Sequence, residues 1–209
     1  MPSHPITYLI GAGGHARVIA DILLASGHPP TAFLDDAPKP NRIFDIPVIQ
    51  GLELPEPTAS VILAIGDNFL RATLASRYSR FAVAIHPSAQ VSRHAEIGPG
   101  TVVMAGAAIN AGARVGAHCI INTRASVDHD CFIADFAHVA PGATLGGNVQ
   151  VGTASMIGLG ANVIHGLVIG ANTVIGAGST VTRDVPDNVV AFGSPARVLR
   201  TRADGDRYL

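Results

Sequence analysis

The sequence predicts a small α/β unit followed by a parallel β-helix built from six-residue repeats. An aliphatic residue stands at every sixth position from Val91 to Val181, sixteen times in succession. Two positions before each of them lies a second series, from Ala89 to Ser179, in which nearly every residue is small. The first 86 residues lack this period and alternate between strand-like and helix-like segments. These three observations together predict the fold class.

The six-residue period resembles that of the left-handed hexapeptide-repeat β-helix. A large inward residue, a small inward residue and a turn in each hexad describe one side of a triangular prism, and three such sides make a coil of 18 residues. Sixteen hexads give about five coils with no inserted loop. Cys119 and Cys131 fall on the small inward positions. We therefore expect both cysteines in the core, and neither a disulfide framework nor structural zinc.

The α/β unit is predicted from alternating segments. YLIGAGGHARVIADILLASG predicts a strand, a glycine turn and an amphipathic helix; TAFLDD and SVILAIGDN predict two more strands, and FLRATLASRY a second helix. The Pro-rich stretch between these two strands is expected to be a loop, and FAVAIHP a last strand that leads into the β-helix. This order predicts a small parallel sheet, about half of a Rossmann fold.

The chain is predicted to divide into an α/β domain (residues 1–86), a β-helix domain (87–182) and a C-terminal extension (183–209). The six-residue register is lost in the extension. We expect VPDNVVAFGSPARVLR to form a short extension beside the last coil, and the charged end TRADGDRYL to fray.

Composition argues against several classes of partner. The 209 residues are 48% hydrophobic and 14% charged, and the formal net charge is −1. Such a chain has no overall positive field for nucleic acid or an anionic membrane, and no apolar run has the length of a spanning helix. We expect a globular cytoplasmic protein that binds neither nucleic acid nor membrane.

The glycine turn predicts a nucleotide site. Gly11 to Ala16 satisfies G-x-G-x-x-[GA], follows a strand and opens a helix, so its amides can face phosphates. Asp35 and Asp36 end the second strand, and Gly66 follows the third, at the sheet edge where ligands of α/β folds bind. Half of a Rossmann fold favours a nucleotide over NAD. A turn that serves only helix–strand packing is the alternative.

Asp128-His129-Asp130 predicts a general base. His129 comes two positions after the inward Val127 and therefore lies on the rim of the prism. A carboxylate that binds one imidazole nitrogen raises the basicity of the other. His138 lies half a coil away and faces another side, so the two histidines can approach only across a subunit interface.

Zinc between subunits is the alternative for these histidines. His129 and His165 are 36 residues apart, which is two coils on one corner, and they resemble a pair of ligands. No third histidine lies near them, since His138 is offset from that corner. We expect no metal.

Both parts of the chain match a known pattern. YLIGAGGHARVIADIL, IGDN, IHPSAQV, VDHDCFIADFAHVAPGATLGGNV and VAFGSPAR, across residues 6–200, resemble the sialic-acid O-acetyltransferase-like family of hexapeptide-repeat acyltransferases. The nucleotide-linked 4-amino-sugar N-acetyltransferases of the bacillosamine and GDP-perosamine type are most similar in appearance. The resemblance implies a homotrimer with acetyl-CoA between subunits, and direct acetyl transfer to the amine of a nucleotide-diphosphate-linked amino sugar held by the α/β domain.

The resemblance also implies roles for individual residues. His129 corresponds to the general base and Asp130 to its acidic helper, which is Glu in many relatives. The residues that correspond to acetyl-CoA contacts are His138, Leu159 and Ala177. The residues that correspond to sugar-nucleotide contacts are Gly13, Gly14 and His15 at the phosphates, Asp35 and Asp36 at the nucleoside, and Gly66 and Asn122 elsewhere on the substrate.

Other activities stay open. The sequence has neither GxSxG nor a Cys-His pairing, so a covalent acyl-enzyme is not expected. An O-acetyltransferase would use the same His129 with a hydroxyl acceptor. A nucleotide-binding scaffold would not need the Asp-His-Asp cluster, and the small sheet disfavours an NAD-dependent enzyme. The nucleotide base and the sugar are not specified by the residues.

Overall fold

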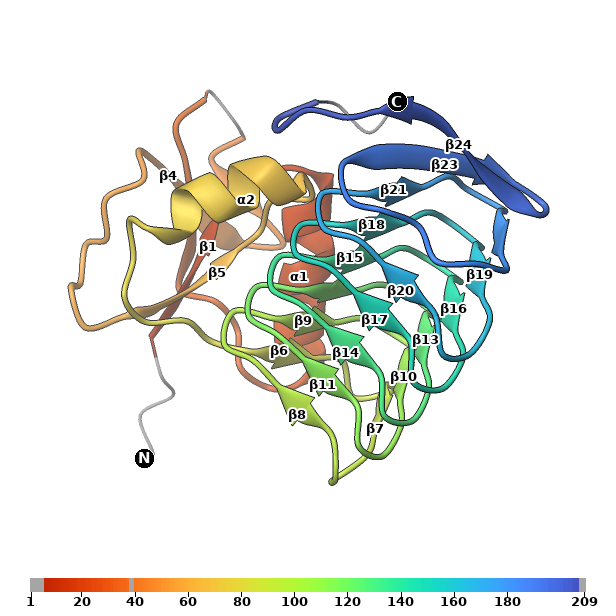
Figure 1. Ribbon diagram of the computed structural model, residues 1–209. Helices are drawn as coiled ribbons and strands as arrows, with labels where there is room; N and C mark the ends of the chain where they lie inside the picture. Colours follow the sequence, from red (N-terminus) through yellow and green to blue (C-terminus); the bar gives the residue numbers. More distant parts are fainter. Residues whose placement is uncertain (1–5, 38–39, 207–209) are drawn as a thin grey trace.

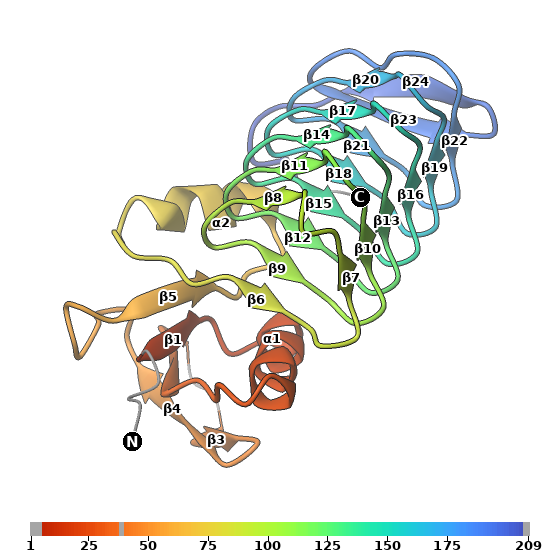
Figure 2. The same ribbon diagram turned by 90° about the horizontal axis from the view of Figure 1, so that it is seen from below.

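The computed structural model describes residues 6–37 and 40–206 and has the predicted fold, an α/β unit beside a parallel β-helix. The α/β unit packs against one side of the prism near its first coils, as Figures 1 and 2 show from two directions. Neither helix in the described part of the chain has the length and apolar character needed to cross a membrane.

A five-stranded sheet with order β3-β4-β2-β1-β5 forms the centre of the α/β unit. Its elements are β1 (Thr7–Ile10), β2 (Ala32–Asp35), β3 (Arg42–Ile43), β4 (Ile46–Gln50), β5 (Ser60–Leu63), α1 (Gly14–Ala25) and α2 (Asn68–Ala75). Strands β1, β2, β4 and β5 are parallel, as predicted. The helices and the glycine turn occur where the sequence predicts them.

The Pro-rich stretch is not a plain loop, which corrects the prediction. It holds the hairpin β3–β4, and β3 is antiparallel to β4, so the sheet is mixed. The two-residue turn is Phe44-Asp45, and both residues have positive φ (50° and 61°). Two left-handed residues match the twist of a hairpin, but they are usually Asn and Gly, so Phe-Asp gave no turn signal.

The predicted last strand of the α/β sheet was assigned to the wrong sheet. Phe81 makes a single parallel bridge to Val61, and then β6 (Ala84–Ile85) pairs with Val102–Val103 of the β-helix. The segment FAVAIHP therefore connects the two sheets. The boundaries at residues 86 and 182 stay predictions.

Three parallel sheets form the sides of the prism, and we name each by one of its early strands. The β7 sheet contains β7 (Gln90–Val91), β10 (Ala108–Ile109), β13 (Ser126–Val127), β16 (Thr144–Leu145), β19 (Asn162–Val163) and β22 (Thr180–Val181). The β8 sheet contains β8 (Glu96–Ile97), β11 (Arg114–Val115), β14 (Phe132–Ile133), β17 (Gln150–Val151) and β20 (Val168–Ile169). The β9 sheet contains β6, β9 (Val102–Val103), β12 (Ile120–Ile121), β15 (His138–Val139), β18 (Met156–Ile157), β21 (Val174–Ile175), β23 (Val189–Gly193) and β24 (Ala196–Thr201).

The strand register confirms the predicted coil. Each strand of the prism pairs with the strand 18 residues further on, as Ile109 does with Val127 and Val127 with Leu145. The aliphatic and small inward residues form one buried cluster, in which Cys119 and Cys131 are 0% and 1% exposed. Three corners join the sheets: β9/β7 (such as residues 122–125), β7/β8 (128–131) and β8/β9 (134–137).

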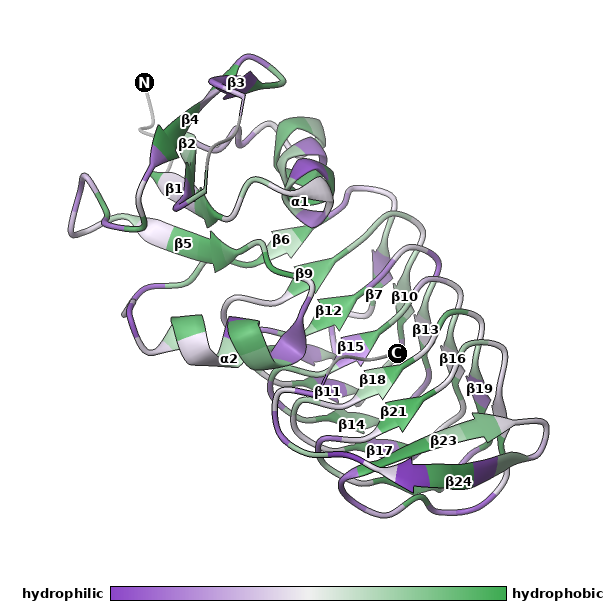
Figure 3. Ribbon diagram, turned by 90° about the horizontal axis from the view of Figure 1, so that it is seen from above, coloured by the Kyte–Doolittle hydropathy of each residue, from purple (hydrophilic) through white to green (hydrophobic). Residues whose placement is uncertain are grey.

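The outer face of the β9 sheet is apolar where the α/β unit covers it. Val102 and Ile120 point outward from this sheet and join a buried cluster with Ile19 and Ile22 of α1. Figure 3 colours β9, β12, β18 and β21 as hydrophobic along this side of the prism. Apolar burial thus attaches α1 to the β-helix.

Two side chains of α2 bind the backbone of three successive coils. Arg71 Nε donates to the carbonyl oxygen of His118 at 2.8 Å, and Arg71 Nη2 to that of Phe136 at 2.9 Å. Asn68 Nδ2 donates to the carbonyl oxygen of Ala154 at 3.0 Å. Asn68 and Arg71 are each 1% exposed. We call this arrangement the carbonyl clamp.

The clamp uses a regular feature of the β8/β9 corner. His118, Phe136 and Ala154 are one coil apart, and all have positive φ (56°, 61° and 58°). Their carbonyl groups therefore stack in a row that one helix can reach. Arg71 also donates to the carbonyl oxygens of Ile65 and Gly66, which connects the clamp to the end of β5.

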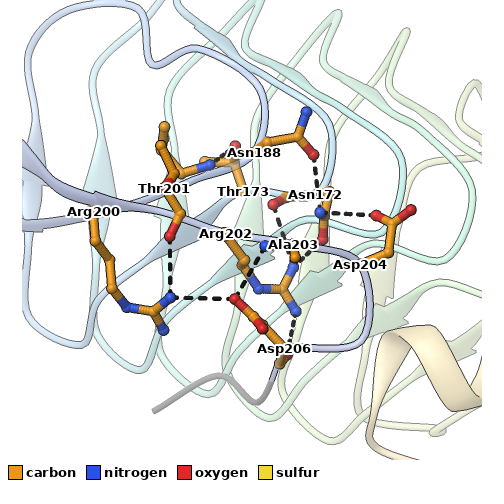
Figure 4. A network of polar contacts seen from close by, with 10 residues as sticks. Asn172, Thr173, Asn188, Arg200, Thr201, Arg202, Ala203, Asp204 and Asp206 are labelled. Carbon is orange, nitrogen blue, oxygen red and sulfur yellow. Dashed lines mark hydrogen bonds and ion pairs between the residues drawn. The ribbon is translucent and has the colours of Figure 1, made fainter.

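The C-terminal segment covers the last coil. Strand β23 is parallel to β21, and β24 returns antiparallel to β23. Arg202 is only 6% exposed and donates to the carbonyl oxygens of Asn172 and Asp206, while Asp206 accepts from the amide of Ala203, a network shown in Figure 4. The predicted fraying is therefore wrong as far as residue 206, because buried hydrogen bonds hold this turn. Residues 207–209 lie outside the described part of the chain.

Replacing Arg71 by Ala should strongly destabilise the protein. The change leaves several buried carbonyl groups without donors, at a cost of about 1–3 kcal/mol for each unpaired group, so we expect a loss of about 3 kcal/mol or more. Urea unfolding measures it. Arg77→Ala is the matched control, since Arg77 on the same side of the unit makes only an exposed ion pair with Glu53 and its loss should cost less than about 1 kcal/mol. Equal effects of the two variants would contradict the clamp.

Candidate functional site

The predicted base lies at the β7/β8 corner, in the turn after β13. His129 Nδ1 is 2.8 Å from Asp130 Oδ2, so the shorter Asp reaches the imidazole as a helper must. The backbone amide of His129 donates to Asp128 Oδ1 at 2.8 Å, and that same oxygen accepts from Asn110 Nδ2 at 2.7 Å. Asp130 thus orients the ring, whereas Asp128 orients the backbone that carries it.

The electrostatics of this turn favour a basic imidazole. The hydrogen bond to Asp130, followed by the negative charge of Asp128, raises the pKa of His129 above its ordinary value. In the neutral ring, the carboxylate fixes the proton on Nδ1 and leaves the lone pair on Nε2. The side chain of His129 is 56% exposed, so Nε2 can be reached by a substrate. A recess of about 380 Å³ opens beside Asp130, between Arg114 and Phe132.

A second cluster forms where α1 meets the outer face of β15. His138 Nε2 is 3.0 Å from Asn122 Nδ2, and Asn122 Oδ1 accepts from the amide of Thr123, which sets the orientation of the Asn122 amide. Asn122 therefore donates to Nε2, and the proton of His138 lies on Nδ1. His15, at the start of α1, is close enough to influence the titration of His138.

Burial makes both of these histidines neutral. Desolvation, followed by the positive charges of Arg71 and His15, lowers the pKa of His138 to about 3. Desolvation and then Arg71 lower the pKa of His15 to about 4. Buried and unpaired within the described chain are His138 Nδ1 and His15 Nε2. At neutral pH these residues can offer hydrogen bonds to a ligand but no charge.

The predicted acetyl-CoA residues are divided between two sites in the fold. Leu159 and Ala177 lie at the β9/β7 corner, one coil apart in a single column, and Leu159 is 54% exposed. Asn122 begins the same corner two coils earlier. A groove of about 630 Å³ runs along the lower coils of this corner past Thr123 and Pro141. His138 borders it through Asn122, whereas His129 lies at a different corner.

The predicted nucleotide residues gather at one edge of the α/β sheet. Gly13 and Gly14 are exposed, with open space where a Cβ would stand. Asp35 Oδ2 accepts from the amide of Ala12 at 2.7 Å, so this carboxylate supports the glycine turn from below. Asp36 is exposed next to it, and Gly66 follows β5 on the other side of β1.

Sequence reasoning missed the residues that bring these parts together. Asn68 belongs to the quoted IGDN motif but binds the β-helix backbone in the clamp, and Arg71 carried no signal except its spacing from Asn68 on one helix face. His118 was also missed; its ring stacks on Phe136 (centroids 4.9 Å apart) and meets the edge of Phe81. In residues 6–37 and 40–206, no group of three or more His, Cys, Asp or Glu side chains is arranged to hold a metal ion.

Known proteins match both parts of the chain. Residues 7–78 match the family model described as the PglD N-terminal domain. The structure of perosamine N-acetyltransferase from Caulobacter crescentus in complex with CoA and GDP-perosamine is similar over 95% of this chain and 98% of that chain, with 41% identity and a TM-score of 0.89. The acetyltransferase domain of PglB from Neisseria gonorrhoeae FA1090 in complex with acetyl coenzyme A is 36% identical, with a TM-score of 0.88 over 94% and 100% of the chains.

Among curated sequences, the similarity is shorter. Galactoside O-acetyltransferase from Lactococcus lactis is 58% identical over 50 residues, which is 24% of each protein. The match to galactoside O-acetyltransferase from Escherichia coli covers 29% of that protein. The chain thus spans about a quarter of the length of these curated relatives.

Stability should fall in mildly acidic solution. His138, His15 and His118 all have a folded-state pKa below the ordinary value of 6.5, which burial lowers first in each case. The unfolded chain therefore binds more protons below pH 6.5, and the free energy of unfolding should decrease from about pH 6.5 towards pH 4.5. Urea unfolding at several pH values measures this slope.

The variant His138→Asn tests the origin of the slope. It removes one of the three buried groups and should flatten the dependence. A free energy of unfolding that stays constant between pH 7 and pH 4.5 would contradict neutral, buried histidines in the folded state.

Proposed function

Because the chain belongs to the hexapeptide-repeat family of nucleotide-linked amino-sugar acetyltransferases, as its motifs predicted, we propose that it acetylates the 4-amino group of a nucleotide-diphosphate-linked sugar with acetyl-CoA. One observation carries the proposal. The His129–Asp130 hydrogen bond forms a basic, accessible imidazole in a chain that matches, along 95% of its length, an enzyme crystallised with CoA and GDP-perosamine. Acetyl-CoA is then a co-substrate, used in the cytoplasm.

The proposed reaction is direct transfer. A protonated sugar amine has no lone pair for attack, so His129 Nε2 removes a proton as the nitrogen approaches the thioester carbonyl. The new C–N bond forms, the tetrahedral intermediate collapses, and the C–S bond breaks. The proton then passes from Nε2 to the departing thiolate of CoA. Asp130 stabilises the imidazolium that forms between these two steps.

We assign the two substrates to different parts of the fold. The exposed turn Gly13-Gly14, supported by Asp35, suits the diphosphate at the start of α1. His15, Asp36, Gly66 and Asn122 complete the substrate contacts that the family resemblance implies. The column of Leu159 and Ala177 suits the pantetheine arm, with His138 at its inner end.

A homotrimer would unite these parts. The proposed base lies at the β7/β8 corner, whereas the proposed acetyl-CoA column lies at the β9/β7 corner, and the β7 sheet separates them. The outward residues of this sheet are mainly small and polar, namely Gln90, Ala108, Ser126, Thr144, Asn162 and Thr180. A threefold axis facing the β7 sheet would set the β9/β7 corner of one subunit against the β7/β8 corner of the next. Each active site would then lie between two subunits.

An O-acetyltransferase is the second candidate. The 58% identity to galactoside O-acetyltransferase over 50 residues favours it. The same His129 would take the proton of a sugar hydroxyl. Thiol release from acetyl-CoA with matched nucleotide sugars, carrying either an amine or a hydroxyl at position 4, separates the two activities.

Replacing His129 by Asn should lower kcat by about 10²–10⁴ and leave sugar-nucleotide binding nearly intact, because the base acts on the proton and not on the nucleotide. Asp130→Asn should cause a smaller loss, since it removes the helper and keeps the imidazole. His165→Asn is the matched control, because His165 lies at the same corner two coils away. Wild-type turnover in His129→Asn would assign the base elsewhere.

Mixed trimers should recover activity from two inactive variants. His129→Asn removes the base at one corner, and Ala177→Trp fills the acetyl-CoA column at the other. Random assembly of equal amounts should give about a quarter of the sites two intact halves, because each site takes one corner from each of two subunits. Co-expression of differently tagged chains, followed by assay of the mixed species, measures this. A site built within one chain would show no recovery.

A further inference from the structure

His129 lies directly over a glycine of the next coil. Gly147 follows His129 by 18 residues and occupies the same place at the β7/β8 corner. A Cβ on Gly147 would stand 2.5 Å from His129 Nε2 and 2.6 Å from Cε1, and the third nearest atom is Cδ2 of the same ring. The ring therefore occupies the space that a side chain at position 147 would take.

The backbone does not itself require glycine at position 147. Its φ lies outside the left-handed region, so an L-residue is allowed there. Neighbouring glycines differ in this respect. A Cβ on Gly146 would meet the backbone nitrogen of His165 at 2.8 Å, and one on Gly158 the carbonyl oxygen of Ile175 at 2.5 Å. Those glycines allow coils to stack, whereas at Gly147 the three closest atoms all belong to one mobile, exposed side chain.

The helper carboxylate lies over a glycine as well. Asp130 Oδ1 occupies the space of a Cβ on Gly112, one coil earlier at the same corner. Since Gly112 has a φ of +76°, it also serves the turn, and it is no independent evidence. It does show that the His129–Asp130 pair spans three coils, with a glycine on each side.

We propose that Gly147 is a positioning residue, which holds the imidazole of His129 in its orientation by leaving free the space over the next coil. The catalytic consequence rests on the proposed function. With a methyl group at position 147, the ring must turn away, because a separation under 3.0 Å cannot persist. The rotation moves Nε2 and disturbs the 2.8 Å contact between Nδ1 and Asp130 Oδ2.

Gly147→Ala tests the proposal, because it retains the backbone amide and adds only the methyl group. We expect folding like the wild type, a fall in kcat of about tenfold or more with KM for both substrates little changed, and a lower titration midpoint for His129. The last effect follows because the hydrogen bond to Asp130 raises the pKa of His129 in the wild type. NMR titration of the ring in the free protein measures it without any substrate.

Gly146→Ala is the contrasting variant, since its Cβ meets backbone; it should lower the melting temperature, with any remaining folded protein keeping the wild-type titration of His129. If Gly147→Ala leaves the titration of His129 unchanged, the positioning role is wrong. If the titration shifts and kcat does not, the positioning role stands and the proposed base is wrong.

A second measurement covers the case in which Gly147→Ala is unstable. In a His129→Ala background the ring is absent, so the added methyl group at position 147 no longer meets any of its three nearest atoms. Its effect on the melting temperature should then disappear. An effect that persists without the ring would assign Gly147 to coil packing and overturn the proposal.

Discussion

The carbonyl clamp is the interaction on which the rest of the structure depends. A guanidinium and an amide that are each 1% exposed can be buried only if their donors are satisfied, and Asn68 and Arg71 meet this requirement largely through main-chain carbonyls. These carbonyls exist in a row because one corner of the β-helix repeats a left-handed turn every coil. The α/β unit is therefore placed by three rungs of the prism at once. That placement brings the glycine turn at α1 to the face that carries His138.

The coil length turns sequence distance into geometry. Residues separated by 18 positions lie on one column, about 4.8 Å apart along the prism, so Leu159 and Ala177 are neighbours, as are His129 and Gly147. Residues separated by six positions lie on different sides of the prism and stay apart within one chain. A site that needs His129 together with the Leu159 column therefore needs two chains. The fold fixes the division before any ligand is considered.

The repeat made most of the β-helix predictable, because each hexad contacts only its neighbours in the coil and the adjacent coils. Val91 to Val181 and both cysteines follow from that rule alone. Arg71 could not be predicted in the same way, since its partners, His118 and Phe136, lie 47 and 65 residues away and contribute only backbone atoms. The turn at Phe44-Asp45 and the burial of Arg202 escaped prediction because both depend on tertiary contacts that override residue preference. At the site, the residue types indicated His129, but the space over Gly147 is visible only in three dimensions.

The fold gives its histidines opposite tasks by their surroundings. His129 is exposed beside two carboxylates, which raise its pKa, whereas His138 and His15 are desolvated near Arg71, which lowers theirs. A group that takes up a proton and a group that stays neutral near pH 7 are what a proton transfer and a hydrogen-bonded contact respectively require. The Arg71 guanidinium that holds the two parts together thus also helps to keep the inner histidines uncharged. Position and protonation state in this protein consequently depend on the same side chain.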